Sequence, residues 1–102
     1  MLLLTVDVVY AATIHGTIYD LSLNKAKDVV VEIDTLQKQR LVSKDGLYSF
    51  NVPPGSYLIT AKYYESSILQ SKTEEPISIK DEGEYILDLF LFPNLDEESE
   101  ML

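Results

Sequence analysis

Hydrophobic and polar residues alternate along most of the chain in short runs, and turn-forming residues separate these runs. Tyr48, Phe50 and Val52, for example, alternate with polar residues. A period of two places alternate side chains on opposite faces of a strand, so each run predicts a β-strand with one buried face. The second and third runs are joined by a short link, which predicts a hairpin. About seven strands are predicted, at 13–19, 29–34, 39–44, 47–52, 56–64, 76–80 and 84–92.

Glycine, proline and aspartate mark the predicted turns. Asp45-Gly46 predicts a tight turn, because glycine adopts positive φ at little steric cost. In the Pro53-Pro54-Gly55 segment, the prolines lack a backbone N–H, so neither flanking strand continues through them as a central strand. We expect this segment to form a stiff hairpin between 47–52 and 56–64, with Tyr57 facing inward.

The order and spacing of these turn and core residues are similar to those of a known family. The stretches IHGTIYD (14–20), KDVVVEI (27–33) and KDGLYSFNVPPGSYLITA (44–61) resemble the carboxypeptidase regulatory-like domain, over about 13–92. The resemblance implies a prealbumin-like (transthyretin-like) fold, which is an all-β, seven- to eight-stranded antiparallel β-sandwich with Ig-like Greek-key topology. The residues that carry it are Gly16, Val31, Asp45, Gly46, Tyr48, Phe50, Pro53, Pro54, Gly55 and Tyr57.

The resemblance implies a structural role. Domains of this kind resemble spacers and accessory modules attached to peptidases, adhesins, transporters and membrane proteins, commonly outside the cell. The zinc-binding His-x-x-Glu pattern of the associated peptidases is absent from this sequence. We therefore expect a non-catalytic accessory or spacer module in an extracytoplasmic protein, either secreted or membrane-anchored, with an attached domain or a protein partner. A cytoplasmic location stays open.

Composition narrows the class of partner. The chain has 102 residues, a length typical of one domain. Its 17 acidic and 8 basic residues give a formal charge of −9, and such a surface repels phosphate backbones, so we expect no nucleic-acid partner. The sequence has no cysteine, which excludes disulfides and thiolate metal sites and leaves the compartment open.

The two ends of the chain are treated separately from the domain at 13–93. Residues 1–12 are apolar like a signal peptide, but no basic residue precedes the run and Asp7 interrupts it. They also alternate like a strand, so a signal remnant and an additional N-terminal strand are both open. The run is too short for a bilayer, which needs about 20 apolar residues. The run of acidic residues within 94–102 indicates an acidic tail or linker.

Few residues offer catalytic chemistry. His15 is the only histidine, and a single histidine builds a zinc site only where several carboxylates converge on it. We therefore expect a packed or surface histidine, with no metal and no cofactor. The sequence contains neither a G-x-S-x-G nucleophile motif nor a glycine-rich phosphate loop. We expect no enzymatic activity.

Tyr63, Tyr64 and Glu65 are candidates for contact with a ligand or partner. Because neighbours on a strand point to opposite faces, one of the two tyrosines must face away from the inner face of its sheet. An exposed tyrosine can stack on a sugar ring or anchor a protein partner. The alternative function is therefore a carbohydrate- or peptide-binding domain.

The last predicted strand is apolar on both faces, with Leu89 and Leu91 on one side and Phe90 and Phe92 on the other. A strand with one face in water is expected to alternate instead. Either another segment of the chain, such as residues 2–10, covers the second face, or a partner chain does. A homodimer through the Phe90/Phe92 face or through the N-terminal strand stays open.

Overall fold

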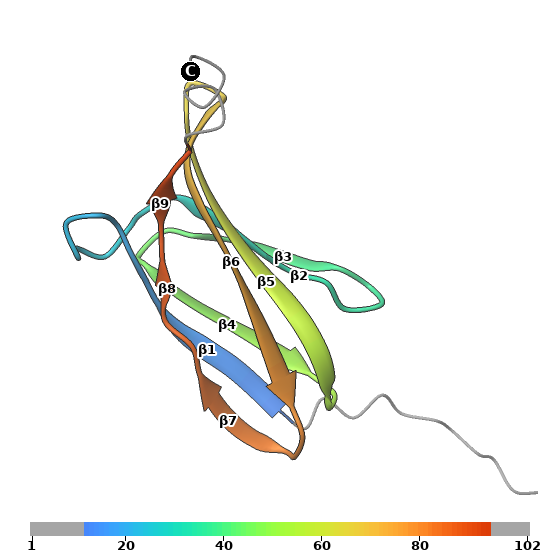
Figure 1. Ribbon diagram of the computed structural model, residues 1–102. Helices are drawn as coiled ribbons and strands as arrows, with labels where there is room; N and C mark the ends of the chain where they lie inside the picture. The colour runs from blue at the N-terminus through green and yellow to red at the C-terminus, as the bar shows by residue number, and fades with distance from the viewer. Residues whose placement is uncertain (1–11, 95–102) are drawn as a thin grey trace, which may run out of the picture.

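The computed structural model describes residues 12–94, which form an all-β, sandwich-like domain of two open sheets (Figure 1). One sheet has four strands and the other has five. No helix in the described part of the chain is long and apolar enough to cross a membrane. The predictions for residues 1–11 and 95–102 lie outside the described residues. The strands are β1 (Ala12–Tyr19), β2 (Val29–Ile33), β3 (Gln39–Ser43), β4 (Leu47–Val52), β5 (Gly55–Glu65), β6 (Ile68–Ile79), β7 (Gly83–Ile86), β8 (Leu89–Phe90) and β9 (Phe92–Pro93).

The four-stranded sheet is mixed. β1 lies between β4 on one side and β7 on the other, and β8 also pairs with β1. β4 is antiparallel to β1, whereas β7 and β8 are parallel to it. The prediction of a purely antiparallel sandwich is therefore wrong for this sheet. Parallel neighbours need a long crossover connection, and here residues 20–82 form that connection.

The five-stranded sheet has the order β3-β2-β5-β6-β9 and is antiparallel throughout, which confirms the predicted pairing of β2 with β3. β5 and β6 form a long hairpin, and its turn, Ser66-Ser67, has positive φ at both residues (50° and 67°), as a type I′ turn requires. Pro76 lies in β6 opposite Leu58. The sequence pattern predicts only 76–80 of β6, because a serine pair is a weaker turn signal than Asn-Gly.

The Pro53-Pro54-Gly55 segment does not form the predicted hairpin. β4 belongs to the four-stranded sheet and β5 to the five-stranded sheet, so the segment carries the chain from one sheet to the other. The Asp45-Gly46 turn between β3 and β4 makes a crossing of the same kind. Turn chemistry marks where a strand ends but not which strand it pairs with, which explains the error.

The last predicted strand, 84–92, is divided among three short strands. β7 and β8 keep one register along β1, since Ala12 pairs with Gly83 and Ile18 pairs with Leu89. β9 instead pairs with β6 in the other sheet. The final segment therefore connects the two sheets along one side of the domain (Figure 1).

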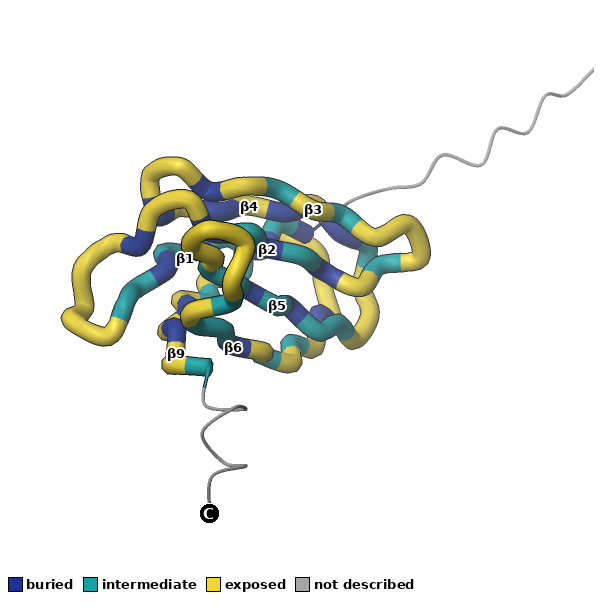
Figure 2. The backbone as a smooth tube through the Cα atoms, turned by 90° about the horizontal axis from the view of Figure 1, so that it is seen from above, coloured by how far each residue is buried: buried dark blue, intermediate teal, exposed yellow. Residues whose placement is uncertain are grey.

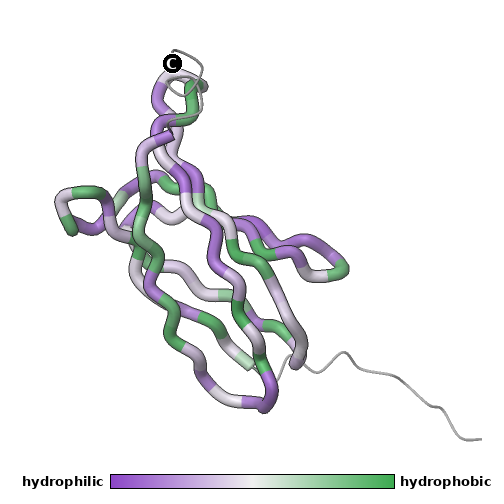
Figure 3. Tube along the Cα trace, in the orientation of Figure 1, coloured by the Kyte–Doolittle hydropathy of each residue, from purple (hydrophilic) through white to green (hydrophobic). Residues whose placement is uncertain are grey.

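The inward-facing residues of both sheets form one core. Burial alternates along β1, β2 and β4, as the sequence pattern predicts (Figure 2). Hydrophobic positions recur along the strands of both sheets (Figure 3). Burying one large aliphatic side chain contributes roughly 1.5–3 kcal/mol, so this layer dominates the stability. The largest fully buried side chains are those of Ile14, Ile18, Val29, Val31, Ile33, Val52, Ile59 and Leu89.

The break between β7 and β8 lies beside Gly16 of β1. There the N–H of Thr17 donates to Oδ1 of Asp88 at 2.9 Å, so a side chain supplies the acceptor within this ladder. The carbonyl of Leu87 accepts a hydrogen bond from the hydroxyl of Tyr48. A Cβ built on Gly16 would lie 2.1 Å from that carbonyl oxygen, so only glycine leaves room for it. We call this arrangement the Gly16 junction.

We expect Gly16→Ala to destabilise the domain by about 3 kcal/mol or to prevent folding, because the new methyl group meets the backbone of Leu87. Gly83→Ala is the matched control. Gly83 has a φ of 127°, but a Cβ there would have no atom within 4 Å, so we expect only the backbone strain of about 1–2 kcal/mol. Urea unfolding followed by circular dichroism measures both losses. Equal losses would contradict the steric explanation.

Candidate functional site

Tyr63, Tyr64 and Glu65 lie at the end of β5, next to the turn of the long hairpin. Tyr63 packs against the core, and its hydroxyl donates to Oε1 of Glu65 at 3.0 Å. This hydrogen bond raises the pKa of Tyr63. Tyr64 is 43% exposed. The structure therefore brings Tyr63 and Glu65 together and leaves one exposed tyrosine ring, and contact with a ligand stays a prediction.

The Asp45-Gly46 turn is held by side chains on either side of it. Oδ1 of Asp45 accepts the N–H of Leu47 at 3.0 Å. The hydroxyl of Ser43 accepts the N–H of Gly46 and donates to the carbonyl of Leu47. Gly46 has a φ of 85°, and a Cβ there would lie 2.8 Å from Cβ of Lys25. These residues shape the crossing from β3 to β4, and Ser43 is a member that the sequence pattern did not indicate.

Two tyrosines close two crossings between the sheets in the same way. The hydroxyl of Tyr57 donates to the carbonyl of Pro53, four residues earlier, at 2.6 Å. The hydroxyl of Tyr85 donates to the carbonyl of Asp81, also four residues earlier, at 2.7 Å, and it accepts the N–H of Asp81 at 3.1 Å. In each corner a glycine lies two residues before the tyrosine, and a Cβ built on Gly55 would lie 3.1 Å from the phenol oxygen. The second corner lacks prolines, so it carries no proline turn signal in the sequence.

Tyr48 and Phe50 are core residues, as predicted. Both side chains are buried, and their ring centroids are 5.9 Å apart. Burial raises the pKa of the Tyr48 phenol above its ordinary value, and the charge of nearby Asp88 raises it further. Its proton is therefore held for the hydrogen bond to Leu87 and is poorly suited to acid–base chemistry near neutral pH.

His15 lies on the outer face of the four-stranded sheet as a partly exposed residue, one of the two environments expected for it. Its Nε2 lies 4.0 Å from Oε2 of Glu84, which is largely exposed. An ion pair with this geometry contributes little to stability. Within residues 12–94 no three histidine or carboxylate side chains are grouped to hold a metal ion. The absence of a metal and a cofactor stays a prediction.

Leu89 and Leu91 are buried, whereas Phe90 and Phe92 are 44% and 57% exposed. The leucines and the phenylalanines therefore lie on opposite faces of this segment, as predicted. Phe90 stacks on Tyr19, with ring centroids 5.2 Å apart. A neighbouring strand of the same chain thus covers part of this face. A homodimer through the Phe90/Phe92 face stays a prediction.

A hollow of about 510 Å³ lies where the loop between β2 and β3 meets the corner between β4 and β5. Such a volume is within the range of about 300–1,000 Å³ that is typical of small-ligand sites. Its lining comes from segments that are separate in the sequence, so no local pattern indicates it. We call it the end hollow; it is lined by Thr35, Leu36, Gln37, Gln39, Pro53, Pro54 and Tyr57.

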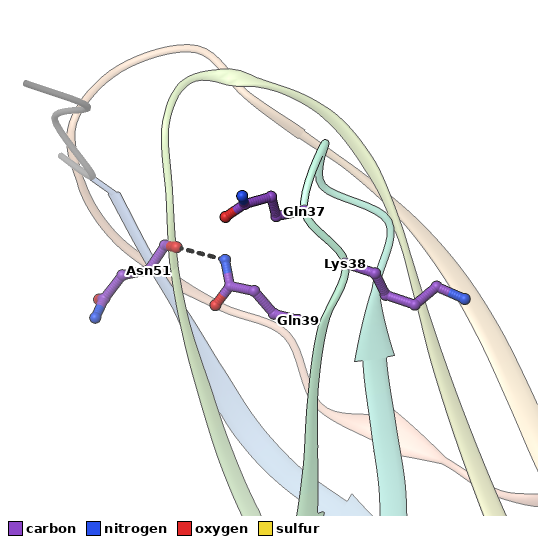
Figure 4. Close-up of a pocket in the computed structure, with 4 residues that line it drawn as sticks. All are labelled: Gln37, Lys38, Gln39 and Asn51. Carbon is purple, nitrogen blue, oxygen red and sulfur yellow. Dashed lines mark hydrogen bonds between the residues drawn. The ribbon is translucent and has the colours of Figure 1, made fainter. Parts of the chain in front are cut away.

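A second hollow of about 350 Å³ shares Gln37 and Gln39 with the end hollow, and we call it the polar margin; it is lined by Gln37, Lys38, Gln39 and Asn51 (Figure 4). Nε2 of Gln39 donates to the backbone carbonyl of Asn51 at 3.0 Å, which ties β3 to β4 at this point. The side chains of Lys38 and Asn51 both point away from Gln37 and Gln39, and only the backbone carbonyl of Asn51 faces them (Figure 4). The margin therefore presents neutral amide groups.

The sequence matches no protein-family model, and no curated protein is found to be similar to it. The structure shows an all-β domain with two sheets, one mixed and one antiparallel. The resemblance to the carboxypeptidase regulatory-like domain is therefore carried by the matching residues alone.

We expect Tyr48→Phe to lower stability at pH 7 by about 1–2 kcal/mol, because the Leu87 carbonyl loses its donor. In the unmodified chain, stability should be complete below the ordinary tyrosine pKa of about 10 and should fall at higher pH. Stability falls above this pH because the phenol of Tyr48 loses its proton in the unfolded chain, whereas in the folded chain its raised pKa keeps it protonated.

Urea unfolding between about pH 8 and pH 11 measures this effect. The fall in stability above pH 10 should be shallower in Tyr48→Phe but not absent, because the pKa values of Tyr57 and Tyr63 are also raised. Tyr64→Phe, which removes an exposed hydroxyl without a hydrogen-bond partner among the described residues, should leave stability at pH 7 unchanged. An unaltered pH profile in Tyr48→Phe would refute the assignment.

We expect Tyr57→Phe to lower the free energy of unfolding by about 1 kcal/mol, because it removes the hydrogen bond that closes its corner. Tyr85→Phe should cost at least as much, because it removes two hydrogen bonds, one to the carbonyl and one from the N–H of Asp81. Thermal unfolding at pH 7 measures the loss, again with Tyr64→Phe as the control. If either corner variant were as stable as the unmodified chain, its hydrogen bond would not contribute to the crossing.

Proposed function

We propose that this chain is a non-catalytic accessory domain that spaces or docks other parts of a larger assembly. The turn and core residues that carry the family resemblance support this function, because their polar groups form hydrogen bonds with the chain's own backbone. Asp45 accepts a backbone N–H, while Tyr48 and Tyr57 donate to backbone carbonyls. Groups engaged in this way stabilise strand crossings and are not free to act on a substrate.

Within the all-β class, we propose more specifically that the fold is the prealbumin-like sandwich of the carboxypeptidase regulatory-like domain. The matching residues support it because each has a structural role: Gly16 at its junction, Asp45-Gly46 at its turn and Tyr57 at its corner. By the same resemblance we propose an extracytoplasmic location, with an attached domain or a protein partner. Nucleic acid is disfavoured as a partner by the charge of −9.

The observation that carries the spacer function is the placement of the first and last segments. β1 and the β7–β8 segment lie side by side and run in the same direction (Figure 1). The described chain therefore enters this ladder at one end, at Ala12, and leaves at the other, beyond Phe90. A domain connected in this way adds its own length to an assembly.

Tension between the two ends would shear this same ladder. Its hydrogen bonds lie across the direction of pull, so they are loaded together and not one after another. They include the N–H of Leu87 to the carbonyl of His15 at 2.9 Å. The bond from Thr17 to Asp88 lies in the middle of the ladder. We infer that the domain resists load as well as supplying length.

The test is single-molecule stretching of the full chain between handles at its two ends. We expect Asp88→Ala to lower the unfolding force, because it removes the acceptor of Thr17 within the loaded ladder. Asp34→Ala is a matched control, since Oδ1 of Asp34 likewise accepts a backbone N–H, that of Leu58, at 2.7 Å but outside this ladder. Each substitution should cost about 1 kcal/mol at equilibrium.

Forced unfolding reports the unfolding rate, so the two variants should differ under load even if their equilibrium stabilities are similar. Equal unfolding forces in the two variants would contradict the load-bearing role. A tightly held, stoichiometric metal in the purified protein, or turnover of a peptide, ester or glycoside substrate, would contradict the non-catalytic function.

The alternative function, a carbohydrate- or peptide-binding domain at Tyr63, Tyr64 and Glu65, has weaker support. Tyr63 and Glu65 are bonded to each other, and Tyr64 offers a single exposed ring. Single exposed aromatic side chains are common on protein surfaces.

A further inference from the structure

We propose that the end hollow binds a neutral carbohydrate, with one hexose ring in the hollow and its hydroxyl groups on the polar margin. This site lies apart from the Tyr63–Glu65 segment and does not depend on the spacer function. It would give an accessory domain a means of attachment to a glycan.

One side of the hollow is apolar. Leu36 is fully exposed, so its side chain has no packing role within the described domain. Pro53, Pro54 and Tyr57 continue this wall. The hydroxyl of Tyr57 already donates to Pro53, so the tyrosine offers a ligand its ring and not its proton. The C–H face of a hexopyranose is apolar and flat, and it suits a wall of this composition.

The other side carries amide groups with unused hydrogen-bonding capacity. Within residues 12–94, the side-chain amide of Gln37 has no partner. Gln39 uses its Nε2 on the backbone carbonyl of Asn51, which leaves its Oε1 free. The side chain of Asn51 points away from both glutamines and accepts a hydrogen bond from Thr13, so it is not counted among these groups (Figure 4). An amide both donates and accepts, and so does a sugar hydroxyl. These groups therefore match an array of hydroxyls.

The charge of the site favours a neutral ligand. About 25% of the chain's residues are charged, yet none of those lining the end hollow is. Lys38, at the margin, points away, and its Nζ lies 3.8 Å from Oε2 of Glu32 (Figure 4). An anionic ligand would meet a chain of charge −9 without a cation in the hollow. The carboxylate of Asp34 lies near Tyr57, but it accepts the N–H of Leu58 and does not line the hollow.

The backbone of the site favours a sugar over an extended peptide. A bound peptide pairs through backbone N–H and C=O groups, as in strand addition. Pro53 and Pro54 have no N–H, and the carbonyl of Pro53 already accepts from Tyr57. The corner therefore has little backbone capacity for a peptide, whereas the side-chain amides are free.

The test is an NMR titration of the full 102-residue chain with cellohexaose, maltohexaose, chitohexaose and a neutral mannohexaose. Hexagalacturonate serves as the anionic arm and a proline-rich decapeptide as the peptide arm. We expect at least one neutral hexasaccharide to bind with a Kd of about 1 mM or tighter and to shift the amide signals of residues 35–39 and 51–57. The anionic sugar and the peptide should not shift them.

Gln37→Ala should weaken this binding about fivefold or more, the effect of one net hydrogen bond. Gln70→Ala, at an exposed glutamine near the hairpin turn, is the matched control and should change nothing. Thermal unfolding should be the same for all three proteins, because both side chains are exposed. Four results would overturn the proposal: no binding of any neutral hexasaccharide, preference for the peptide or the anionic sugar, full binding in Gln37→Ala, or loss of binding in Tyr64→Ala.

Discussion

The hydrogen bond from the hydroxyl of Tyr48 to the carbonyl of Leu87 connects three strands of the four-stranded sheet. Tyr48 lies in β4, the carbonyl belongs to the break between β7 and β8, and Gly16 of β1 lies between them without a side chain. Asp88 supplies the acceptor that the ladder needs at this point. The last segment can therefore follow β1 in one register and then cross to the other sheet, so both the mixed sheet and the link between the sheets depend on this junction.

Tyrosine hydroxyls recur wherever the chain changes sheet between β4 and β7. Tyr57 and Tyr85 each bond to a backbone carbonyl four residues earlier, across a glycine with positive φ (157° at Gly55 and 127° at Gly83). A half-buried tyrosine combines a large apolar body with a directional hydroxyl group. It therefore suits a position where a strand leaves the sheet and its carbonyls lose their ladder partners. The spacing Gly-x-Tyr thus has a local structural explanation in both corners.

The sequence predicted the positions of most strands, because a buried face imposes a period of two on residues such as Tyr48, Phe50 and Val52. It did not predict which strands pair. The Pro53-Pro54-Gly55 segment ends a strand whether the next one lies beside it or in another sheet, and the parallel run of β7 along β1 is a contact across 71 residues that no local pattern encodes. The end hollow was missed for the same reason, since Gln37 and Pro54 meet only in the folded chain.

Pro76 affects whether the edge of β6 can pair with a strand of another copy of the domain. The N–H and C=O of Leu58 both bond to Asp34, on the side of β2. The opposed residues Leu58 and Pro76 therefore form a pair without backbone hydrogen bonds between β5 and β6. The backbone nitrogen of Pro76 consequently points away from β5, towards the free side of β6. Among the described residues, β9 covers this side only at Ser71 and Lys72. A proline at such a sheet edge removes an N–H donor that a strand from another copy would use. It therefore opposes edge-to-edge pairing of domains into a continuous, amyloid-like sheet.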